Sequence, residues 1–236
     1  MSNMRLSKRI HDLADSVSLG ESIADIGTDH AYVPMLLVKA GVTDNVIMSD
    51  ISEGSLAKAV ETFDKANINA DSSQFRVADG LDGIETAEVD DIIIAGLGGF
   101  TIIDILSKDI AKSKSFRKLI LQPRKFSGNL RYFLYTNGWD IINEKLSPEG
   151  KFVCEIITAV PSKEDSREPL YGEDDIRWKY PETFKLADQT LLKKRLDWKL
   201  SSIDEEIANL NKSNADTSIE IAKLLADKKY LIELIK

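Results

Sequence analysis

Short apolar runs alternate with helix-like patterns along the first two thirds of the chain. The predicted strands cover residues 22–26, 46–49, 74–78, 91–95 and 118–121. Between them apolar residues recur at steps of three and four, as at Leu56, Ala59, Val60 and Phe63, which is the period of a helix with one buried face. Strands that alternate with helices form a parallel sheet with right-handed crossovers, so the predicted class is α/β.

Two further apolar stretches, residues 138–146 and 151–157, are separated only by Ser147-Pro148-Glu149-Gly150. A connection this short cannot cross over a sheet, so the two strands must be antiparallel. An antiparallel hairpin at the end of a parallel sheet is typical of the class I (Rossmann-like) S-adenosylmethionine-dependent methyltransferase domain. It argues against the all-parallel fold of NAD-binding enzymes.

The pattern changes after residue 160. Residues 161–180 have the polar, Pro- and Gly-bearing composition of a linker, and two helical runs follow within residues 181–236. Their apolar positions are Leu192, Leu196, Leu200, Ile203, Ile207 and Leu210, then Ile221, Leu224, Leu231 and Ile235. We therefore expect a domain at 1–160, a linker at 161–180 and a C-terminal antiparallel coiled-coil hairpin at 181–236. So narrow a hairpin must also lean on the main domain or on a partner.

The first predicted strand runs into a turn with one glycine, Gly27, and then into a helix. Such a turn frees backbone N–H groups and lets a ligand approach closely. A dinucleotide fingerprint needs three glycines, but the later positions are Asp29 and Ala31. A carboxylate at Asp29 would repel a pyrophosphate and suits a ligand with a cationic centre. The turn therefore favours S-adenosylmethionine over NAD or ATP.

The next predicted strands end in residues that suit the same ligand. Asp50 follows the second strand, where an acid typically binds ribose hydroxyls, and Asp79 follows the third, where a carboxylate can accept the adenine amine. A single such Asp could be only a helix cap or a turn residue, but carboxyl ends of parallel strands share one edge. The predicted cofactor-binding residues are Asp25, Gly27, Thr28, Asp29, His30, Asp50, Ile51, Asp79, Gly80, Gly96, Leu97 and Gly98.

Length, composition and cysteine content limit the size of the domains and the cellular compartment. The 236 residues can hold one ordinary core and a smaller module. The single cysteine, Cys154, cannot form an internal disulfide, which favours a reducing compartment. The first residues lack the apolar segment of a signal peptide, and no run approaches the roughly 18 apolar residues of a membrane span. We expect a cytoplasmic protein with no membrane contact and no metal, either a monomer or a weak dimer.

The net charge of −8 is unusual for a nucleic-acid-binding protein, but its distribution is uneven. Residues 111–131 contain seven cations and no acid, and they flank the fifth predicted strand. We therefore expect this stretch, with the basic N-terminus, to meet phosphates near the mouth of the site. The predicted nucleic-acid-binding residues are Arg5, Lys8, Arg9, Arg117, Lys118, Arg124, Lys125 and Arg131. A second basic group, Lys193, Lys194, Arg195 and Lys199, either is simply solvated or contacts nucleic acid.

Several of these segments resemble one known family. The strings are Arg5–Ile10, Asp25-Ile26-Gly27-Thr28-Asp29-His30-Ala31-Tyr32-Val33-Pro34, Ala95–Gly99, Leu121-Gln122-Pro123 and Lys151-Phe152. They resemble the TrmK family, bacterial methyltransferases that act on N1 of the adenine at position 22 of tRNA, over almost all of the first 160 residues. The family usually carries Met where this chain has Leu97, a swap that keeps volume and apolarity. The resemblance implies S-adenosylmethionine as cofactor and tRNA as partner.

The implied reaction needs no nucleophilic side chain, because ring N1 of adenine carries a lone pair. The enzyme must position the base and place a neighbour for the developing positive charge. Asp29 is the predicted catalytic neighbour, accepting a hydrogen bond or a proton from the exocyclic N6. His30 is the second catalytic candidate, either as an acid–base group or as a structural hydrogen-bonding residue. Enzymes that methylate N6 commonly carry an Asp/Asn-Pro-Pro-Tyr/Phe clamp, in place of which this chain has Gly96-Leu97-Gly98-Gly99.

Two other functions remain open from the residues alone. One is a small-molecule methyltransferase, against which the acid-free basic stretch argues. The other is a non-catalytic cofactor-binding module that docks a protein through the helical hairpin. The set Asp25, Gly27, Asp50 and Asp79 argues against the second, because it retains the groups that cofactor binding requires.

Overall fold

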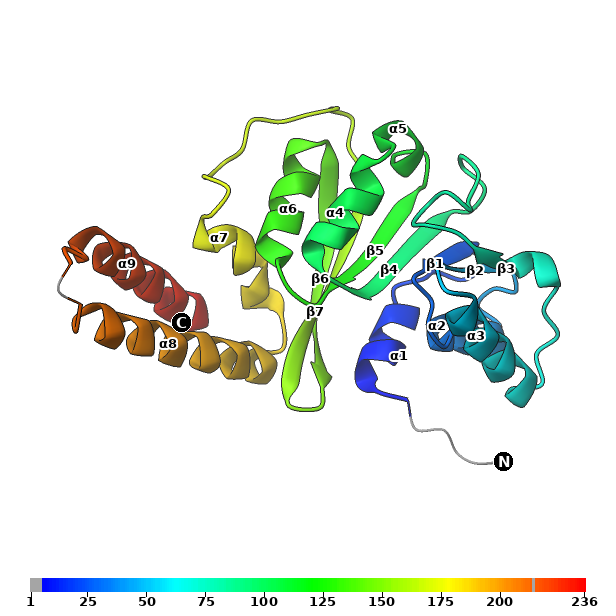
Figure 1. The fold of residues 1–236 in the computed structure, drawn as a ribbon, viewed down its shortest axis with the longest axis horizontal. Helices are drawn as coiled ribbons and strands as arrows, with labels where there is room; N and C mark the ends of the chain where they lie inside the picture. Colours follow the sequence, from blue (N-terminus) through cyan, green and yellow to red (C-terminus); the bar gives the residue numbers. More distant parts are fainter. Residues whose placement is uncertain (1–5, 214) are drawn as a thin grey trace.

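The computed structural model describes residues 6–213 and 215–236, which contain a seven-stranded sheet in the order β3-β2-β1-β4-β5-β7-β6 (Figure 1). The strands are β1 Ile23–Ile26, β2 Val46–Asp50, β3 Phe75–Val77, β4 Asp91–Leu97, β5 Lys118–Pro123, β6 Trp139–Glu149 and β7 Phe152–Pro161. The first five are parallel, and β7 is antiparallel to both of its neighbours. This confirms the predicted methyltransferase fold with its antiparallel terminal hairpin.

The hairpin strands are longer than the sequence predicts. Ser147 and Pro148, expected in the turn, continue the ladder of β6 and pair with Cys154 and Val153. Proline is tolerated there because β6 is the edge strand of the sheet and one side of its backbone needs no ladder partner. Pro123, which the sequence predicts to stop the fifth strand, is itself the last residue of β5.

Helices cover both faces of the sheet. They are α1 Lys8–Ala14, α2 Tyr32–Lys39, α3 Glu53–Lys65, α4 Gly99–Ser107, α5 Ile110–Ser113 and α6 Ser127–Thr136, with a short 3-10 turn at Ser72–Gln74. Alternate residues of β4 face opposite layers: Ile93 packs with α1, α2 and α3, whereas Ile92 and Ile94 pack with α4 and α6. Two apolar layers therefore fix the carboxyl ends of the parallel strands along one edge, which we call the carboxyl edge.

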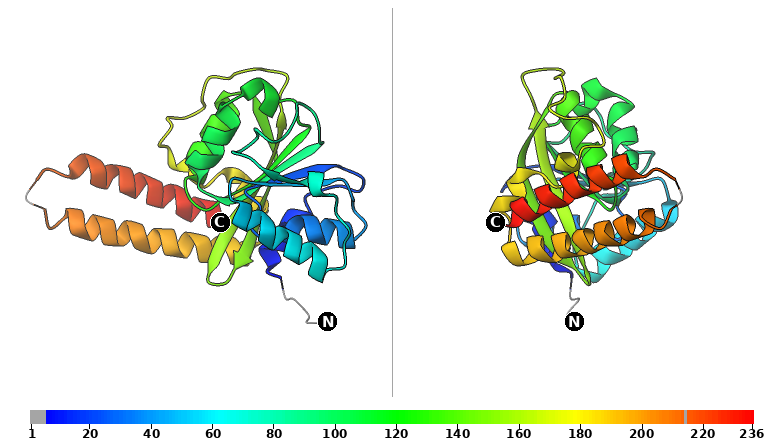
Figure 2. Two further views of the ribbon diagram at one scale, coloured as in Figure 1. Left: turned by 45° about the vertical axis from the view of Figure 1, so that its right-hand side comes forward. Right: turned by 90° about the vertical axis from the view of Figure 1, so that its left-hand side faces the viewer.

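The C-terminal part begins with α7 Ile176–Lys179 and a 3-10 turn at Glu182–Leu186, followed by α8 Gln189–Leu210 and α9 Ser218–Ile235. The last two helices pack against each other and extend away from the sheet (Figure 2). Their base shares a core with β6 and with Tyr180 and Phe184. The hairpin therefore leans on the main domain, as expected, and the end of the predicted linker is packed.

A buried ionic network joins this base to the sheet. Arg131 of α6 binds Glu144 of β6 with Nε–Oε1 at 2.6 Å and Glu155 of β7 with Nη2–Oε2 at 2.5 Å. Arg195 of α8 pairs with the same Glu155, and Ser127 Oγ donates to it. Arg131 is 2% exposed, so its prediction as a phosphate contact was wrong: its charge is neutralised inside the core.

Candidate functional site

The carboxyl ends of β1, β2 and β4 lie side by side at the candidate site. Ile26 pairs with Ser49 of β2 on one side and with Ile94 of β4 on the other. Gly27, with φ of 75°, follows directly, and a Cβ placed on it would lie 3.5 Å from Leu97 Cδ1. The turn after β1 therefore lies beside the end of β4, as the parallel arrangement predicts.

Asp25 is buried just below this turn. Thr28 Oγ1 donates a hydrogen bond of 2.6 Å to its Oδ2. Burial raises the pKa of the Asp25 carboxyl to about 6, against the opposing effects of the Thr28 hydrogen bond and the Arg9 charge, and with a small addition from Asp50. The carboxylate is thus poorly solvated, and a cation brought against it would stabilise its charged form.

The sequence predicts free backbone N–H groups in the turn after β1, but the structure does not show them. The N–H groups of Gly27 and Thr28 both donate to Ser49 O, at 2.8 and 3.1 Å, and so are not free for a ligand. The helix α2 begins only at Tyr32, after Ala31 in the left-handed region with φ of 50°. The turn can therefore let a ligand approach the backbone at Gly27, and it holds the side chains around it, such as Thr28, in fixed positions.

Asp50, the last residue of β2, and Asp79, just after β3, also reach this edge. Asp50 Oδ1 accepts from Ser52 N at 2.8 Å, which shapes the turn into α3, and Ile51 next to it is largely exposed. Asp79 lies after β3, with Lys108 Nζ 3.7 Å from its Oδ2. Gly80, with φ of 56°, packs against Ile105 of α4. The structure thus brings Asp25, Asp50 and Asp79, which lie at or just after the ends of β1, β2 and β3, to one edge of the sheet.

Asp29 and His30 project from the same turn and contact each other. His30 Nε2 lies 3.3 Å from Asp29 Oδ2, and the His30 ring stacks on Tyr32 with centroids 5.0 Å apart. Lys58 of α3 donates to Asp29 Oδ1 at 2.6 Å and lowers the pKa of Asp29. Sequence reasoning missed Lys58, whose only signal was its place on the polar face of a helix that follows the second strand. Asp29 is therefore ionised at neutral pH.

The predicted glycine turn forms the end of β4 and the start of α4, and hydrogen bonds tie it to the turn after β5. Arg124 N donates to Leu97 O and Gly99 N donates to Lys125 O, both at 2.8 Å. A Cβ on Gly99 would lie 2.4 Å from Phe126 O, so no other residue fits without displacing backbone. The Arg124 side chain lies over Gly96, with Nη2 3.7 Å from the position of a Cβ there.

Only part of the predicted basic stretch reaches the carboxyl edge. Arg124 and Lys125 do, and both are exposed. Arg117 and Lys118 precede or begin β5 and thus lie at the opposite edge, where Arg117 pairs with Glu21. Lys118 is buried, with Nζ 2.6 Å from Glu21 Oε2 and 3.0 Å from Asp91 Oδ2. Their prediction as contacts near the mouth of the site was wrong, because a strand separates the cations at its two ends.

The predicted nucleic-acid-binding cations near the N-terminus also differ in where they lie and in how they are paired. Arg9 Nη1 donates to Gln122 Oε1 at 3.1 Å, and its charge acts on Asp25, so Arg9 lies at the carboxyl edge. It is only partly exposed and also pairs with Glu149. Lys8 is exposed but pairs with Asp12. Arg5 lies outside the described residues.

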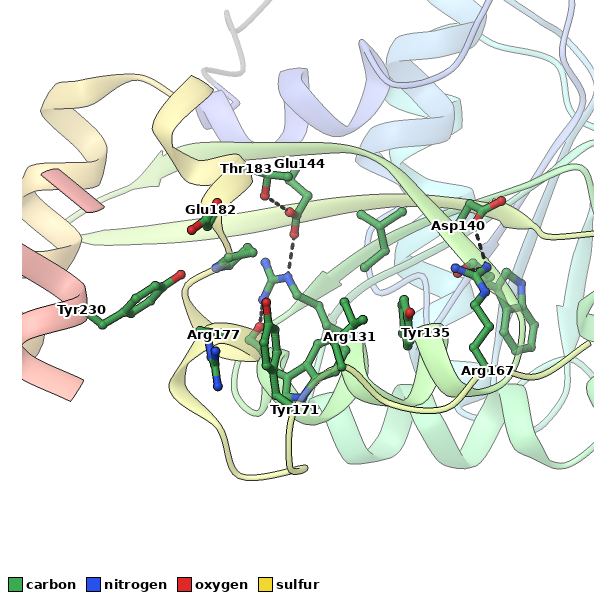
Figure 3. A pocket seen from close by; sticks show the side chains of 15 residues that line it. Arg131, Tyr135, Asp140, Glu144, Arg167, Tyr171, Arg177, Glu182, Thr183 and Tyr230 are labelled. Carbon is green, nitrogen blue, oxygen red and sulfur yellow. Dashed lines mark hydrogen bonds and ion pairs between the residues drawn. The ribbon is translucent and has the colours of Figure 1, made fainter. Parts of the chain in front are cut away.

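A separate cavity of about 400 Å³ lies between α6, β6 and the start of the C-terminal part (Figure 3). Its lining includes Arg131, Arg167 and Arg177, and each arginine is paired with a carboxylate. The cavity contains none of the residues predicted for the cofactor. In residues 6–213 and 215–236 no cluster of His, Cys, Asp and Glu could hold a metal ion, and no helix there could span a membrane.

Known proteins share both the sequence and the fold. Residues 6–157 match a family described as a methyltransferase domain. A tRNA (adenine(22)-N1)-methyltransferase of Bacillus subtilis is 33% identical over 166 residues, 70% of this chain and 69% of that one. The crystal structure of the B. subtilis tRNA methyltransferase TrmK has a TM-score of 0.79 at 26% identity, covering 99% of this chain and 100% of that one. A Streptococcus pneumoniae protein solved with S-adenosyl-L-methionine has a TM-score of 0.77 at 26% identity, covering 98% and 100%.

Proposed function

We infer the function from one premise: the chain belongs to the TrmK family of bacterial tRNA (adenine(22)-N1)-methyltransferases. The protein is an S-adenosylmethionine-dependent enzyme that methylates N1 of adenine 22 in tRNA. The observation that carries this conclusion is the match to the B. subtilis enzyme at 33% identity over 166 residues. The acids gathered at the carboxyl edge support it, since they suit a cofactor with cationic groups and ribose hydroxyls.

The residues at the carboxyl edge fit S-adenosylmethionine. Asp50 would accept hydrogen bonds from the ribose hydroxyls, and Asp79 with exposed Ile51 would hold the adenine. Gly27 would let the chain pass close to the cofactor, and buried Asp25 would face its positive charge. When bound, the cofactor would supply the methyl group of its sulfonium. That methyl group is transferred to N1 of adenine, and the sulfur remains as a thioether.

The protein's own task is to position the base and to stabilise its charge. Asp29, which Lys58 keeps ionised, is suited to accept a hydrogen bond from the adenine N6 as N1 becomes positive. An ionised acid with a lowered pKa is a weak base, so we propose the electrostatic role for Asp29. His30, stacked on Tyr32 and in contact with Asp29, would hold that carboxylate in place.

Methyl transfer to a defined tRNA tests the proposal. The protein with labelled S-adenosylmethionine should methylate a transcript that carries adenine 22, and nuclease mapping should place the label at N1 of that nucleotide. A transcript with guanine 22 is the matched control and should stay unlabelled. Transfer to small metabolites but not to tRNA would contradict the proposal, and so would cofactor binding without any transfer.

The surface that meets the tRNA backbone can be tested by charge reversal. Arg124→Glu with Lys125→Glu should weaken tRNA binding and reduce the log–log salt slope by roughly one unit for each phosphate that the protein no longer neutralises. Cofactor affinity should hold. Lys39→Glu, an exposed cation at the end of α2 on the opposite edge, is the control. Equal weakening by the control would show that only the overall charge matters.

A further inference from the structure

Two phenylalanines stand exposed beside the candidate site. Phe100 in the first turn of α4 is 46% exposed, and Phe126 directly before α6 is 51% exposed. Their rings touch, with centroids 4.6 Å apart and planes inclined by 44°. Large apolar side chains grouped on a surface mark a site of interaction more often than single ones do. This pair is therefore suited to bind a ligand with an apolar or aromatic face.

The backbone holds the pair rigidly. Phe126 has φ of 59°, a left-handed conformation that is strained for a bulky residue. It is maintained because Gly99, with no side chain, packs against the carbonyl of Phe126 and bonds to that of Lys125. Two turns from adjacent strands therefore lock the two rings into one lip, which we call the phenylalanine lip.

Unpaired cations flank the phenylalanine lip. Arg124 and Lys125 immediately precede Phe126 and are exposed. Among the ion pairs of residues 6–213 and 215–236, none involves either of them, whereas Lys118, Lys114 and Arg131 are all paired. An aromatic surface beside free cations is the combination that single-stranded nucleic acids recognise, with bases stacked on rings and phosphates near the charges.

The lip also lies next to the reacting centre. Leu97 lies three residues before Phe100, and a Cβ placed on Gly27, in the turn after β1, would lie 3.5 Å from Leu97 Cδ1. A base stacked on the lip would present its edge toward the space above Gly27 and Leu97. The glycines at 96, 98 and 99 add no side chain of their own there, and the Arg124 side chain lies over Gly96.

We propose that Phe100 and Phe126 form the stacking surface for the target adenine once it is extruded from the tRNA, with Arg124 and Lys125 on the phosphates beside it. This inference rests on the proposed function and adds the residues that position the substrate. Stacking leaves the Watson–Crick edge open, so N1 can be aimed at the methyl group while Asp29 meets the exocyclic amine.

The test is single-turnover methylation of the adenine 22 transcript by Phe100→Ala, Phe126→Ala and the double variant. Loss of one base–aromatic stack corresponds to a fall of about 5- to 150-fold in the rate at saturating tRNA. Tryptophan at either position should restore most of the rate, because it again offers a flat face. Phe152→Ala, an exposed phenylalanine on the β6–β7 hairpin, is the matched control and should keep the rate.

Cofactor affinity and the unfolding midpoint should stay unchanged in all variants, which separates positioning from folding. A second readout uses 2-aminopurine in place of adenine 22 with S-adenosylhomocysteine bound: emission should be quenched by the unmutated protein and brighter with the double variant. Unchanged rates in the alanine variants would overturn the inference while leaving the function intact. So would a loss confined to tRNA affinity, since the lip would then hold another part of the RNA. Failure of the unmutated protein to methylate tRNA would instead refute the proposed function.

Discussion

The buried carboxyl of Asp25 should make the stability of the protein depend on pH in a defined direction. Burial raises its pKa from 3.8 to about 6. The folded state therefore binds more protons than the unfolded state between these values, and stability falls as pH rises through that window. At 1.36 kcal/mol per pKa unit the free energy of unfolding should lose about 3 kcal/mol from this group by pH 7.

The variant Asp25→Asn isolates this effect from other titrating groups. Asparagine has nearly the same shape and can still accept the Thr28 hydrogen bond, but it carries no charge. In urea unfolding without cofactor, variant and unmutated protein should be about equally stable at pH 4, and the variant should be more stable by up to about 3 kcal/mol at pH 7.5. A stability difference that stays constant from pH 4 to 7.5 would refute the assignment.

Cofactor binding should show the opposite trend. A sulfonium or ammonium group against Asp25 favours its ionised form, so the affinity for S-adenosylmethionine should increase as pH rises through about 6. The Asp25→Asn variant should bind more weakly at pH 8 and lose this pH dependence. Isothermal titration at several pH values measures both. An identical pH profile in the two proteins would place the cofactor's charge elsewhere.

Three further changes have definite expected outcomes. Asp50→Ala should weaken S-adenosylmethionine binding by about 1.5–3 kcal/mol, measured by equilibrium titration, because the ribose loses a charged acceptor; a change within twofold would remove Asp50 from the site. Asp29→Asn should slow single-turnover methylation while cofactor and tRNA affinities hold, and a matching loss of cofactor affinity would make it a binding residue only. Glu155→Gln should lower the free energy of unfolding by about 3–5 kcal/mol, since it leaves buried arginine charge uncompensated, whereas Ser127→Ala should cost only about 1 kcal/mol in the same urea titration.

The fold and the outline of the site were predictable because their signals are local. Alternating strand and helix periods fix a parallel sheet, and a parallel sheet brings the ends of its strands to one edge. Gly27, Asp50 and Gly96 could therefore be placed together from the sequence. The short connection after residue 146 was also enough to predict an antiparallel pair, although not the length of its strands.

Ion pairing was not predictable, because partners lie far apart in the chain. Lys118 meets Glu21 and Asp91 across the amino ends of three strands, and Lys58 meets Asp29 from a neighbouring helix. A run of cations in the sequence does not reveal which of them are neutralised. Only contacts between elements separate a cation that is free to bind phosphate from one that holds the fold together.

This distinction explains how a chain of net charge −8 can use tRNA as substrate. The overall negative field opposes approach of a polyanion from a distance, but salt screens that field beyond about 8 Å at physiological ionic strength. At contact range the unpaired charges decide, and at the carboxyl edge Arg124 and Lys125 are exposed without an acidic partner among the described residues. Two unpaired cations therefore attract phosphate at the edge where the base must enter, although other exposed cations, such as Lys39 and Lys194, also lie outside the ion pairs of the described residues.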